Sequence, residues 1–394
     1  MLLTWLSRCR KLYNACLEQR RIAYRGYGKQ LSVYDQTNQL PEMKNGLPEY
    51  KEVNAQVLQD VVRKADKSFQ NFFRRVKNGE KPGYPRFKSR HRFNSFTFPQ
   101  SQSVFRIKGD NVLWMSKLGD FKLIQHREIP ADAKLKTLTI KRDACGDWWA
   151  TFSADIGETP EKQLIESTVG VDVGITKLAT LSTGQFFENK QFIKRQEKKL
   201  KLCDRRFSRK KKGSKNRDKA RLKRARAYRK LMNQRKDNAH KVSRYMVDSF
   251  DLIAFEDLKI RNMMKNHHLA KAIGDSSWGM LTQFTAYKAE EAGKTVVLVD
   301  PKNTSQECSV CGTIVRKSLA VRVHVCPNCN FAADRDLNAS FNILNRALKQ
   351  IGRGPPESTP VEIGVQPLEN ISPRLSRSMK QEATPLTPEV LGCV

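Results

Sequence analysis

The spacing of hydrophobic positions divides the first 160 residues into a helical part and a strand-rich part. Residues 1 to about 80 have a helical pattern, and Val53 to Val76 carries an apolar residue every three or four positions, which is the period of one helix face. The breaker Lys81-Pro-Gly-Tyr-Pro85 follows. Between 93 and 156, short alternating runs are separated by glycine and aspartate; they cover 96–98, 104–107, 112–114, 138–140 and 148–152. This texture predicts a small antiparallel sheet or barrel.

From Ser167 onward, apolar runs alternate with helical segments. Strands are predicted at 169–175, 178–181, 252–255 and 296–299, a long helical pair at 190–249, and single helices at 278–292 and 336–348. Strands that alternate with helices indicate an α/β sheet, so the predicted fold class is α/β and multidomain. Seven of the 16 prolines fall after residue 351, and this composition predicts a disordered tail at 352–394.

The net charge of the chain predicts a polyanionic binding partner. The chain has 394 residues and a net charge of +33, and such an excess repels itself unless an anionic partner offsets it. Nucleic acid is the first candidate and an anionic membrane surface the second. No apolar run is long enough to span a bilayer, and the first residues show no signal-peptide cleavage pattern. We therefore expect an intracellular, cytoplasmic protein.

The positive charge is concentrated in one stretch. Residues 190–236 contain 23 Lys or Arg against three acids, and the densest part comprises Arg205, Arg206, Arg209, Lys210, Lys211 and Lys212. A run of charged residues often forms only a solvent-exposed surface that binds no partner. Here opposite charges are nearly absent, so we expect the stretch to bind phosphates with release of counterions.

Four of the nine cysteines form two CxxC steps. Cys308 and Cys311 are separated by fourteen residues from Cys326 and Cys329. Two such knuckles close a tetrahedral four-thiolate site, which predicts a structural Zn²⁺ rather than a catalytic one. The alternative is a redox dithiol pair, which needs no second CxxC. The remaining cysteines are predicted to be free thiols; they are Cys9, Cys16, Cys145, Cys203 and Cys393.

Three acidic residues stand at the edges of core elements. Asp172 lies inside an apolar run, Glu256 ends another, and Asp336 opens a helix. Each has an ordinary explanation when taken alone: a hydrogen-bonded structural aspartate, a solvated strand end and a helix N-cap. Together on one sheet they can converge on two divalent cations, Mg²⁺ or Mn²⁺, which activate water for phosphoryl displacement.

The motifs occur in a specific order. They are Gly170-Val-Asp172-Val-Gly174, Phe255-Glu256-Asp-Leu258, Asn303-Thr-Ser-Gln306 with the two cysteine pairs, and Asp334-Arg-Asp336-Leu-Asn338-Ala339. This set resembles the TnpB proteins of insertion sequences, relatives of type V CRISPR effector nucleases, over roughly residues 5 to 350. Softer likeness lies in Leu12-Tyr-Asn14, Phe69-Gln-Asn-Phe-Phe73 and Gly83-Tyr-Pro-Arg-Phe-Lys88.

The resemblance implies an RNA-guided DNA endonuclease of a transposable element. Its partners would be a guide RNA from the transposon end and double-stranded target DNA, with a short target-adjacent motif read by the protein. By resemblance, Asp172, Glu256 and Asp336 are the catalytic, metal-binding acids, with Asp334 as the competing choice for the third.

The resemblance also implies a domain order. We expect a helical recognition region at 1–80, a wedge-like β-barrel at 81–165, an RNase H-like RuvC nuclease domain at 166–303 and 333–351, and an inserted zinc ribbon at 304–332. The family usually begins with a β-strand, whereas Leu2 to Asn14 opens almost inside the first helix. The barrel is therefore expected to lack a strand.

Two glutamines of the N-terminal region are candidates for reading the target-adjacent motif. Gln56 and Gln59 lie outside the apolar stripe of the helix at 53–76, and an amide side chain can form two hydrogen bonds with adenine in the major groove. We therefore expect one of them to contact the target-adjacent motif.

An unguided transposon nuclease or transposase is the first alternative function, although the chain has no Tyr- or Ser-recombinase pattern. A non-catalytic nucleic-acid-binding regulator is the second.

Overall fold

The computed structural model describes residues 1–101, 103–109, 111–125, 129–157, 160–318 and 320–352, and the backbone of Gln366–Pro367 and Thr384–Leu386. The predicted disordered tail lies mostly outside the described residues. The chain forms two compact units, one built on Met1–Gly157 and the other on Glu158–Ser378. No helix in the described part of the chain is long and apolar enough to span a bilayer.

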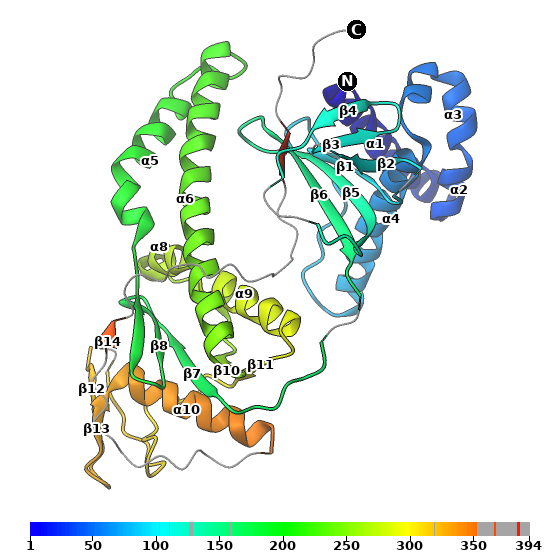
Figure 1. Cartoon of the computed structure of the whole chain (residues 1–394). Coiled ribbons are helices and arrows are strands. Elements are labelled where there is room, and N and C mark those ends of the chain that lie inside the picture. The colour runs from blue at the N-terminus through cyan, green and yellow to red at the C-terminus, as the bar shows by residue number, and fades with distance from the viewer. Residues whose placement is uncertain are drawn as a thin grey trace. The chain divides into compact units, whose positions relative to one another are not determined.

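The first unit packs helices and two antiparallel sheets around one core (Figure 1). Its helices are α1 (Leu2–Tyr27), α2 (Val33–Asn38), α3 (Leu40–Gly46), the 3-10 helix η1 (Pro48–Glu52) and α4 (Ala55–Lys77). Its strands are β1 (Ser95–Phe98), β2 (Phe105–Lys108), β3 (Val112–Met115), β4 (Gly119–Lys122), β5 (Lys134–Arg142) and β6 (Trp148–Asp155). The sheets have the orders β1-β5-β6, extended by β15 (Thr384–Leu386), and β2-β3-β4.

The core of this unit confirms the predicted helix stripe and strand alternation. Val57 and Val61 of α4 are fully buried, as are Phe96 and Phe98 of β1, and Trp5 of α1 packs 5.5 Å from the Phe96 ring. The helices and sheets therefore share one hydrophobic interior. The helices α2 and α3 lie within the region predicted as helical, although the sequence did not predict separate bounds for them. The sequence did not predict β4, because this strand is short and carries few apolar residues.

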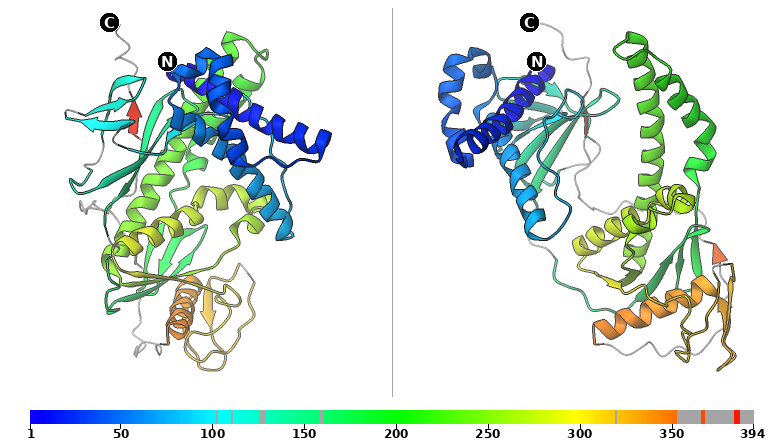
Figure 2. Two further views of the ribbon diagram at one scale, coloured as in Figure 1. Left: turned by 90° about the vertical axis from the view of Figure 1, so that its right-hand side faces the viewer. Right: turned by 180° about the vertical axis from the view of Figure 1, so that it is seen from behind.

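The second unit is a mixed sheet between helices (Figure 2). Its strands are β7 (Thr168–Val173), β8 (Lys177–Leu181), β9 (Gln185–Glu188), β10 (Leu252–Glu256), β11 (Thr295–Val299), β12 (Val323–Val325), β13 (Ala332–Asp334) and β14 (Gln366–Pro367). Its helices are α5 (Phe192–Ser208), α6 (Lys215–Ser249), α7 (Ile260–Met263), α8 (His267–Ser276), α9 (Trp278–Glu291) and α10 (Arg335–Gln350). The predicted strands and helices of this half are confirmed; α7 and α8 were not predicted.

The main sheet has the order β11-β10-β7-β8-β9-β14. β7, β10 and β11 are parallel, and β8 runs antiparallel to β7 and β9. Along β10, Ile253 and Phe255 pack with α6 and α9, whereas Leu252 and Ala254 pack with α10. Because side chains alternate along a strand, this pattern shows a three-layer arrangement with α10 alone on one face (Figure 1).

Helix α10 approaches β7 closely at Gly170. A Cβ atom built on this glycine would lie 2.0 Å from the Ser340 carbonyl oxygen and 2.8 Å from the Leu344 nitrogen, both backbone atoms of α10. Backbone cannot move aside as a flexible side chain can, so only glycine allows this contact. The glycine of the Gly170-Val-Asp172 motif therefore sets the distance between helix and sheet.

This contact predicts a large stability effect from one added methyl group. We expect Gly170→Ala to lower the free energy of unfolding by about 2–4 kcal/mol, because overpacking forces the helix from the strand. Chemical denaturation at constant protein concentration measures it. Gly274→Ala is the control: its Cβ would meet only the Met264 methyl at 3.7 Å, so this helix substitution should be neutral or stabilising by up to about 1 kcal/mol. Equal effects of both variants would contradict the close-approach argument.

Candidate active site and metal centre

Asp172 and Glu256 lie side by side at the ends of neighbouring parallel strands. The last paired residues of β7 and β10 are Val171 and Phe255, and the next residue on each strand is an acid. Since Val171 and Phe255 face α6 and α9, the alternation of a strand directs Asp172 and Glu256 toward the face covered by α10. Neighbouring strands are about 4.8 Å apart, so the two side chains are adjacent.

Asp336 approaches from the first turn of α10. The pKa of the Asp172 carboxyl is raised well above its usual range, first by burial and then by the charges of Glu256 and Asp336. Burial also raises the pKa of Glu256, although the Thr304 hydroxyl opposes the shift. The structure thus brings the three predicted acids close enough to repel one another.

Asp334, the competing acid, has a different environment. Its Oδ1 accepts hydrogen bonds from the backbone N–H groups of Asp336 at 2.8 Å and Leu337 at 3.3 Å, which makes it the N-cap of α10. Its Oδ2 accepts from Lys177 Nζ at 3.0 Å. The ordinary explanation of Asp336 as an N-cap is therefore wrong, because Asp334 holds that position.

The remaining contacts of the acids come from residues that sequence reasoning gave no role. The Thr304 hydroxyl donates to Glu256 Oε1, and Thr304 is buried. Asp336 Oδ1 lies 3.2 Å from the Arg335 guanidinium and 4.0 Å from that of Arg322. Thr304 belongs to the Asn303-Thr-Ser-Gln306 motif, so its place in an ordered motif was the available signal.

The four cysteines of the two CxxC steps converge. Their sulfur atoms all lie within 4.8 Å of one another, with Cys308 to Cys329 at 3.6 Å and Cys311 to Cys326 at 3.5 Å. A disulfide would need about 2.05 Å, whereas a tetrahedron with Zn–S bonds of about 2.3 Å has sulfur–sulfur edges of about 3.8 Å. The cluster therefore fits a tetrahedral metal ion.

Both knuckles have the same backbone geometry. The N–H of Gly312 donates to the Cys308 carbonyl at 2.9 Å, and the N–H of Asn330 donates to the Cys326 carbonyl at 3.0 Å. Gly312 and Asn330 both have positive φ, 75° and 58°, and asparagine tolerates this region better than other side chains do. Asn330 is therefore the counterpart of Gly312 in the second knuckle.

Polar side chains of α10 attach the cysteine-bearing segment to the helix. Asn338 accepts from the Ser309 N–H at 3.0 Å and donates to the Glu307 carbonyl at 2.7 Å. Asn342 donates to the carbonyls of Thr304 and Glu307 at 2.8 and 2.7 Å. Both amides are buried, so these bonds are expensive to break. The helix that carries Asp336 also holds the segment that carries Thr304 and the first knuckle.

The acids form a wider group than the cysteines. Within the described residues, the cysteine set is the one group of three or more metal-ligating side chains whose ligand atoms all lie within 4.8 Å of one another. The three acids therefore do not all bring their ligand atoms within 4.8 Å of one another, as the cysteines do. A site for two ions about 4 Å apart spreads its carboxylates over a greater span than a single tetrahedral ion does.

Among the cysteines that the structure describes, those outside the two CxxC steps belong to no group of metal-ligating side chains. Cys9, Cys16 and Cys203 are free thiols, as predicted, and burial raises the pKa of Cys9 to about 12. Cys145 is buried, and Cys393 lies outside the described residues.

The six basic residues of the densest run cluster at the tip of the α5–α6 hairpin. Arg205 and Arg206 end α5, and Arg209 to Lys212 form the turn; all six are exposed. Among the described residues none of the six has an ion-pair partner. Arg217 has a structural role instead, since it donates to the carbonyls of Phe207 at 3.3 Å and Lys210 at 2.7 Å. The tip is thus an ordered turn with unpaired charge.

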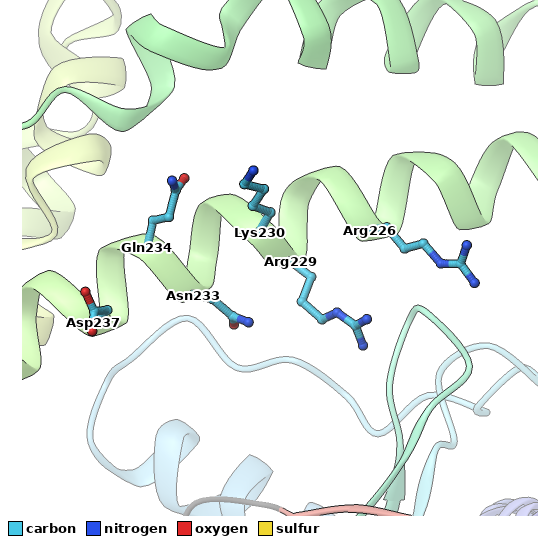
Figure 3. Close-up of a pocket in the computed structure, with 6 residues that line it drawn as sticks. All are labelled: Arg226, Arg229, Lys230, Asn233, Gln234 and Asp237. Atoms are coloured by element: carbon cyan, nitrogen blue, oxygen red, sulfur yellow. The ribbon is translucent and has the colours of Figure 1, made fainter. Parts of the chain in front are cut away.

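Helix α6 extends this basic surface along its length. Figure 3 shows a shallow depression lined by six of its side chains: Arg226, Arg229, Lys230, Asn233, Gln234 and Asp237. Gln234 accepts from Gln196 of α5, so Lys230 and Gln234 lie on the α5 side, whereas Arg226 and Arg229 point away from it (Figure 3). Only one of the six lining residues is acidic.

The two glutamines expected to read DNA lie at the start of α4. Both are partly exposed, and Gln56 donates to Gln100 Oε1 at 2.7 Å. Neighbouring Asn54 is buried and caps the helix by accepting from the Gln56 N–H at 2.9 Å.

Two family models match the second half of the chain. Residues 151–267 match the model OrfB_IS605, described as "Probable transposase", and residues 278–343 match the Cas12f1-like TNB domain. A Streptomyces pristinaespiralis protein named as an RNA-guided DNA endonuclease is 33% identical over 377 residues, 95% of this chain and 90% of that protein. InsQ of Escherichia coli K12, named likewise, is 28% identical over 354 residues, 85% of this chain and 86% of that protein.

The fold also resembles a solved structure. The Cas12f1 chain in a cryo-EM structure of a complex with sgRNA and target DNA superposes with a TM-score of 0.55 at 16% identity, covering 87% of this chain and 82% of that one. At this identity the likeness shows a shared fold alone. The nearly full-length match to the Streptomyces protein, at 33% identity, shows more: this chain belongs to the TnpB family.

Proposed function

We propose that the chain is an RNA-guided DNA endonuclease of a transposable element, which hydrolyses phosphodiester bonds in a RuvC-like site. The observation that carries the proposal is the convergence of Asp172, Glu256 and Asp336 on one edge of the sheet, where burial first, and then the charges of Glu256 and Asp336, raise the pKa of Asp172. The strand order and the single antiparallel strand β8 support an RNase H-like nuclease domain. The names of the relatives support guidance by RNA.

The three carboxylates would hold two divalent cations, Mg²⁺ or Mn²⁺. Two such ions would activate a water molecule and stabilise the leaving oxygen of an in-line displacement. The residues of this chain supply the negative charge and its orientation: Thr304 fixes one oxygen of Glu256, and the α10 N-terminus fixes Asp336. Asp334 serves as the cap that orients this helix, which supports Asp336 as the third ligand.

We further propose that the four cysteines bind one structural Zn²⁺. The donor set leaves no open coordination position, so the ion would order the ribbon rather than take part in hydrolysis. Four thiolates also suit zinc better than the oxygen-preferring ions of the carboxylate site.

The α5–α6 tip and the α6 face are proposed to hold nucleic-acid backbone through phosphate contacts. Such contacts position a strand without reading sequence, which suits an enzyme whose specificity comes from base pairing. Gln56 or Gln59 in the N-terminal unit, with its predicted wedge-like barrel, stays our proposal for reading the target-adjacent motif.

An unguided transposon nuclease is the second candidate, favoured by the match to the transposase model. It would use the same acids but carry no RNA. A non-catalytic regulator is less favoured, because three converging acids cost stability and a regulator has no use for them.

The guided-nuclease proposal predicts which acids are essential. Wild-type protein purified from its host should carry a defined RNA and, with Mg²⁺ or Mn²⁺, cleave DNA that matches this RNA. Asp172→Asn, Glu256→Gln and Asp336→Asn should each reduce cleavage at least about 100-fold, because each removes charge from the metal site. Asp334→Asn should retain more activity, since an asparagine still caps a helix.

Two results would redirect this proposal. Cleavage without copurified RNA would support the unguided nuclease, and a fully active Asp336→Asn beside an inactive Asp334→Asn would move the third ligand by two residues.

Thermal melting gives a readout of the acid cluster that is independent of cleavage. Because folding raises the pKa of Asp172, the stability of the fold falls as pH rises above the ordinary carboxyl pKa, so at neutral pH without metal Asp172→Asn should melt about 2 °C higher or more. It should also lose stabilisation by Mn²⁺.

Metal analysis tests the zinc assignment. We expect about one zinc per folded chain, and Cys326→Ser should lose it because three thiolates bind the ion far more weakly. Cys203→Ser is the matched control, since this free thiol lies on α5 and should leave the zinc content unchanged. Folded wild-type protein without zinc, or with disulfides between the CxxC cysteines, would instead support the redox pair.

Charge neutralisation tests the hairpin tip. Replacing Lys210, Lys211 and Lys212 with glutamine should weaken nucleic-acid binding and reduce the slope of log affinity against log salt by about 0.7–0.9 for each lost phosphate contact. The control replaces Lys136, Lys201 and Lys241, which changes net charge equally but removes lysines that already have carboxylate partners. Equal changes in slope for both triples would show that net charge alone matters.

A further inference from the structure

A groove of about 490 Å³ lies on the first unit, between α1, α4 and the segment 83–92, which has neither helix nor strand. Its volume is within the range of about 300–1,000 Å³ typical of pockets for small ligands. The lining residues are Tyr13, Ser68, Asn71, Phe72, Arg75, Gly83, Pro85, Arg86, Phe87, Lys88 and Arg92. Four of them are cations, and none is acidic.

The irregular segment is held in place by α1. The Asn14 amide donates to the Lys88 carbonyl at 3.1 Å and accepts from the Lys88 N–H at 2.8 Å, so it pairs with this backbone as a neighbouring strand would. Lys88 Nζ lies 4.5 Å from the centre of the Tyr13 ring. These contacts fix the segment without using the side chains of Arg86, Phe87 or Arg92.

Aromatic rings are left facing solvent on this fixed segment. Phe87 is 50% exposed and Tyr84 is 49% exposed. Tyr84 meets Phe72 edge-on, with ring centres 5.4 Å apart, and the Arg21 guanidinium lies 5.6 Å from the Phe87 ring centre. Half-exposed aromatic rings beside cations are the chemistry of sites that stack unpaired bases and neutralise their phosphates.

We propose that this groove binds an unpaired nucleotide of RNA, with the base stacked on Phe87 and the flanking phosphates contacted by Arg86 and Arg92. An acidic peptide would use the cations but leave the ring faces unfilled, whereas a nucleotide uses both. Asn71, exposed on the same groove, offers an amide for the 2′-hydroxyl that distinguishes RNA from DNA. The inference rests on the proposed function for RNA as the resident partner.

Site-specific crosslinking tests the proposal. The full chain is irradiated with oligouridine RNA or its deoxyribose counterpart, and crosslinked peptides are identified by mass spectrometry. We expect RNA adducts in the peptide that contains Phe87, and weaker adducts with DNA. Phe87→Leu keeps an apolar side chain but removes the stacking surface, so RNA affinity should fall about 5- to 150-fold. Phe87→Trp should retain binding.

The variants separate stacking from charge and from folding. Phe87→Leu should leave the salt slope of binding unchanged, whereas Arg86→Gln with Arg92→Gln should reduce it by about 0.7 for each lost contact. All variants should melt like wild type, since these side chains are exposed. Unchanged affinity in Phe87→Leu, or adducts only with DNA, would overturn the inference while the guided nuclease stands. Wild-type protein that binds no RNA would overturn both.

Discussion

The close approach of α10 to β7 at Gly170 is the contact on which the arrangement of the three acids depends. With Ser340 and Leu344 against this glycine, the first turn of α10 reaches the end of β7, where Asp172 lies. A side chain at position 170 would raise the helix from the sheet and take Asp336 with it. The glycine is therefore part of the site, although it offers no ligand atom.

The same helix connects the acid cluster to the cysteine cluster. Asn338 and Asn342 lie about half a turn and nearly two turns after Asp336, and both bind the backbone of the segment that leads into the first knuckle. Thr304, at the start of that segment, bonds to Glu256. Movement of the ribbon relative to α10 would disturb Glu256 through Thr304, so the order of the ribbon and the orientation of the acids are coupled through a few buried hydrogen bonds.

The sequence predicted the features that depend on local pattern. Apolar runs placed Asp172 and Glu256 on strands and Asp336 at the start of a helix, and the CxxC spacing identified the four cysteines whose sulfur atoms converge. It could not show that Asp334 rather than Asp336 caps α10, because either acid suits a first turn and only the bonds to Lys177 and two backbone N–H groups distinguish them. The motif at 303–306 singled out the segment that contains Thr304, but the role of this threonine depends on its contact with the distant Glu256, which sequence alone does not show.

Electrostatics connects the proposed partners with the charge distribution of the chain. Asp172 is buried beside two further acids, and bound divalent cations would relieve the repulsion between them. The hairpin tip and the N-terminal groove gather basic side chains with few carboxylates, and bound phosphates would relieve the repulsion between these. Folding alone offsets neither the repulsion among the acids nor the repulsion among the basic side chains. A bound partner of opposite charge would offset each. The least favourable charges in the free protein are therefore where its ions and nucleic acids are expected to bind.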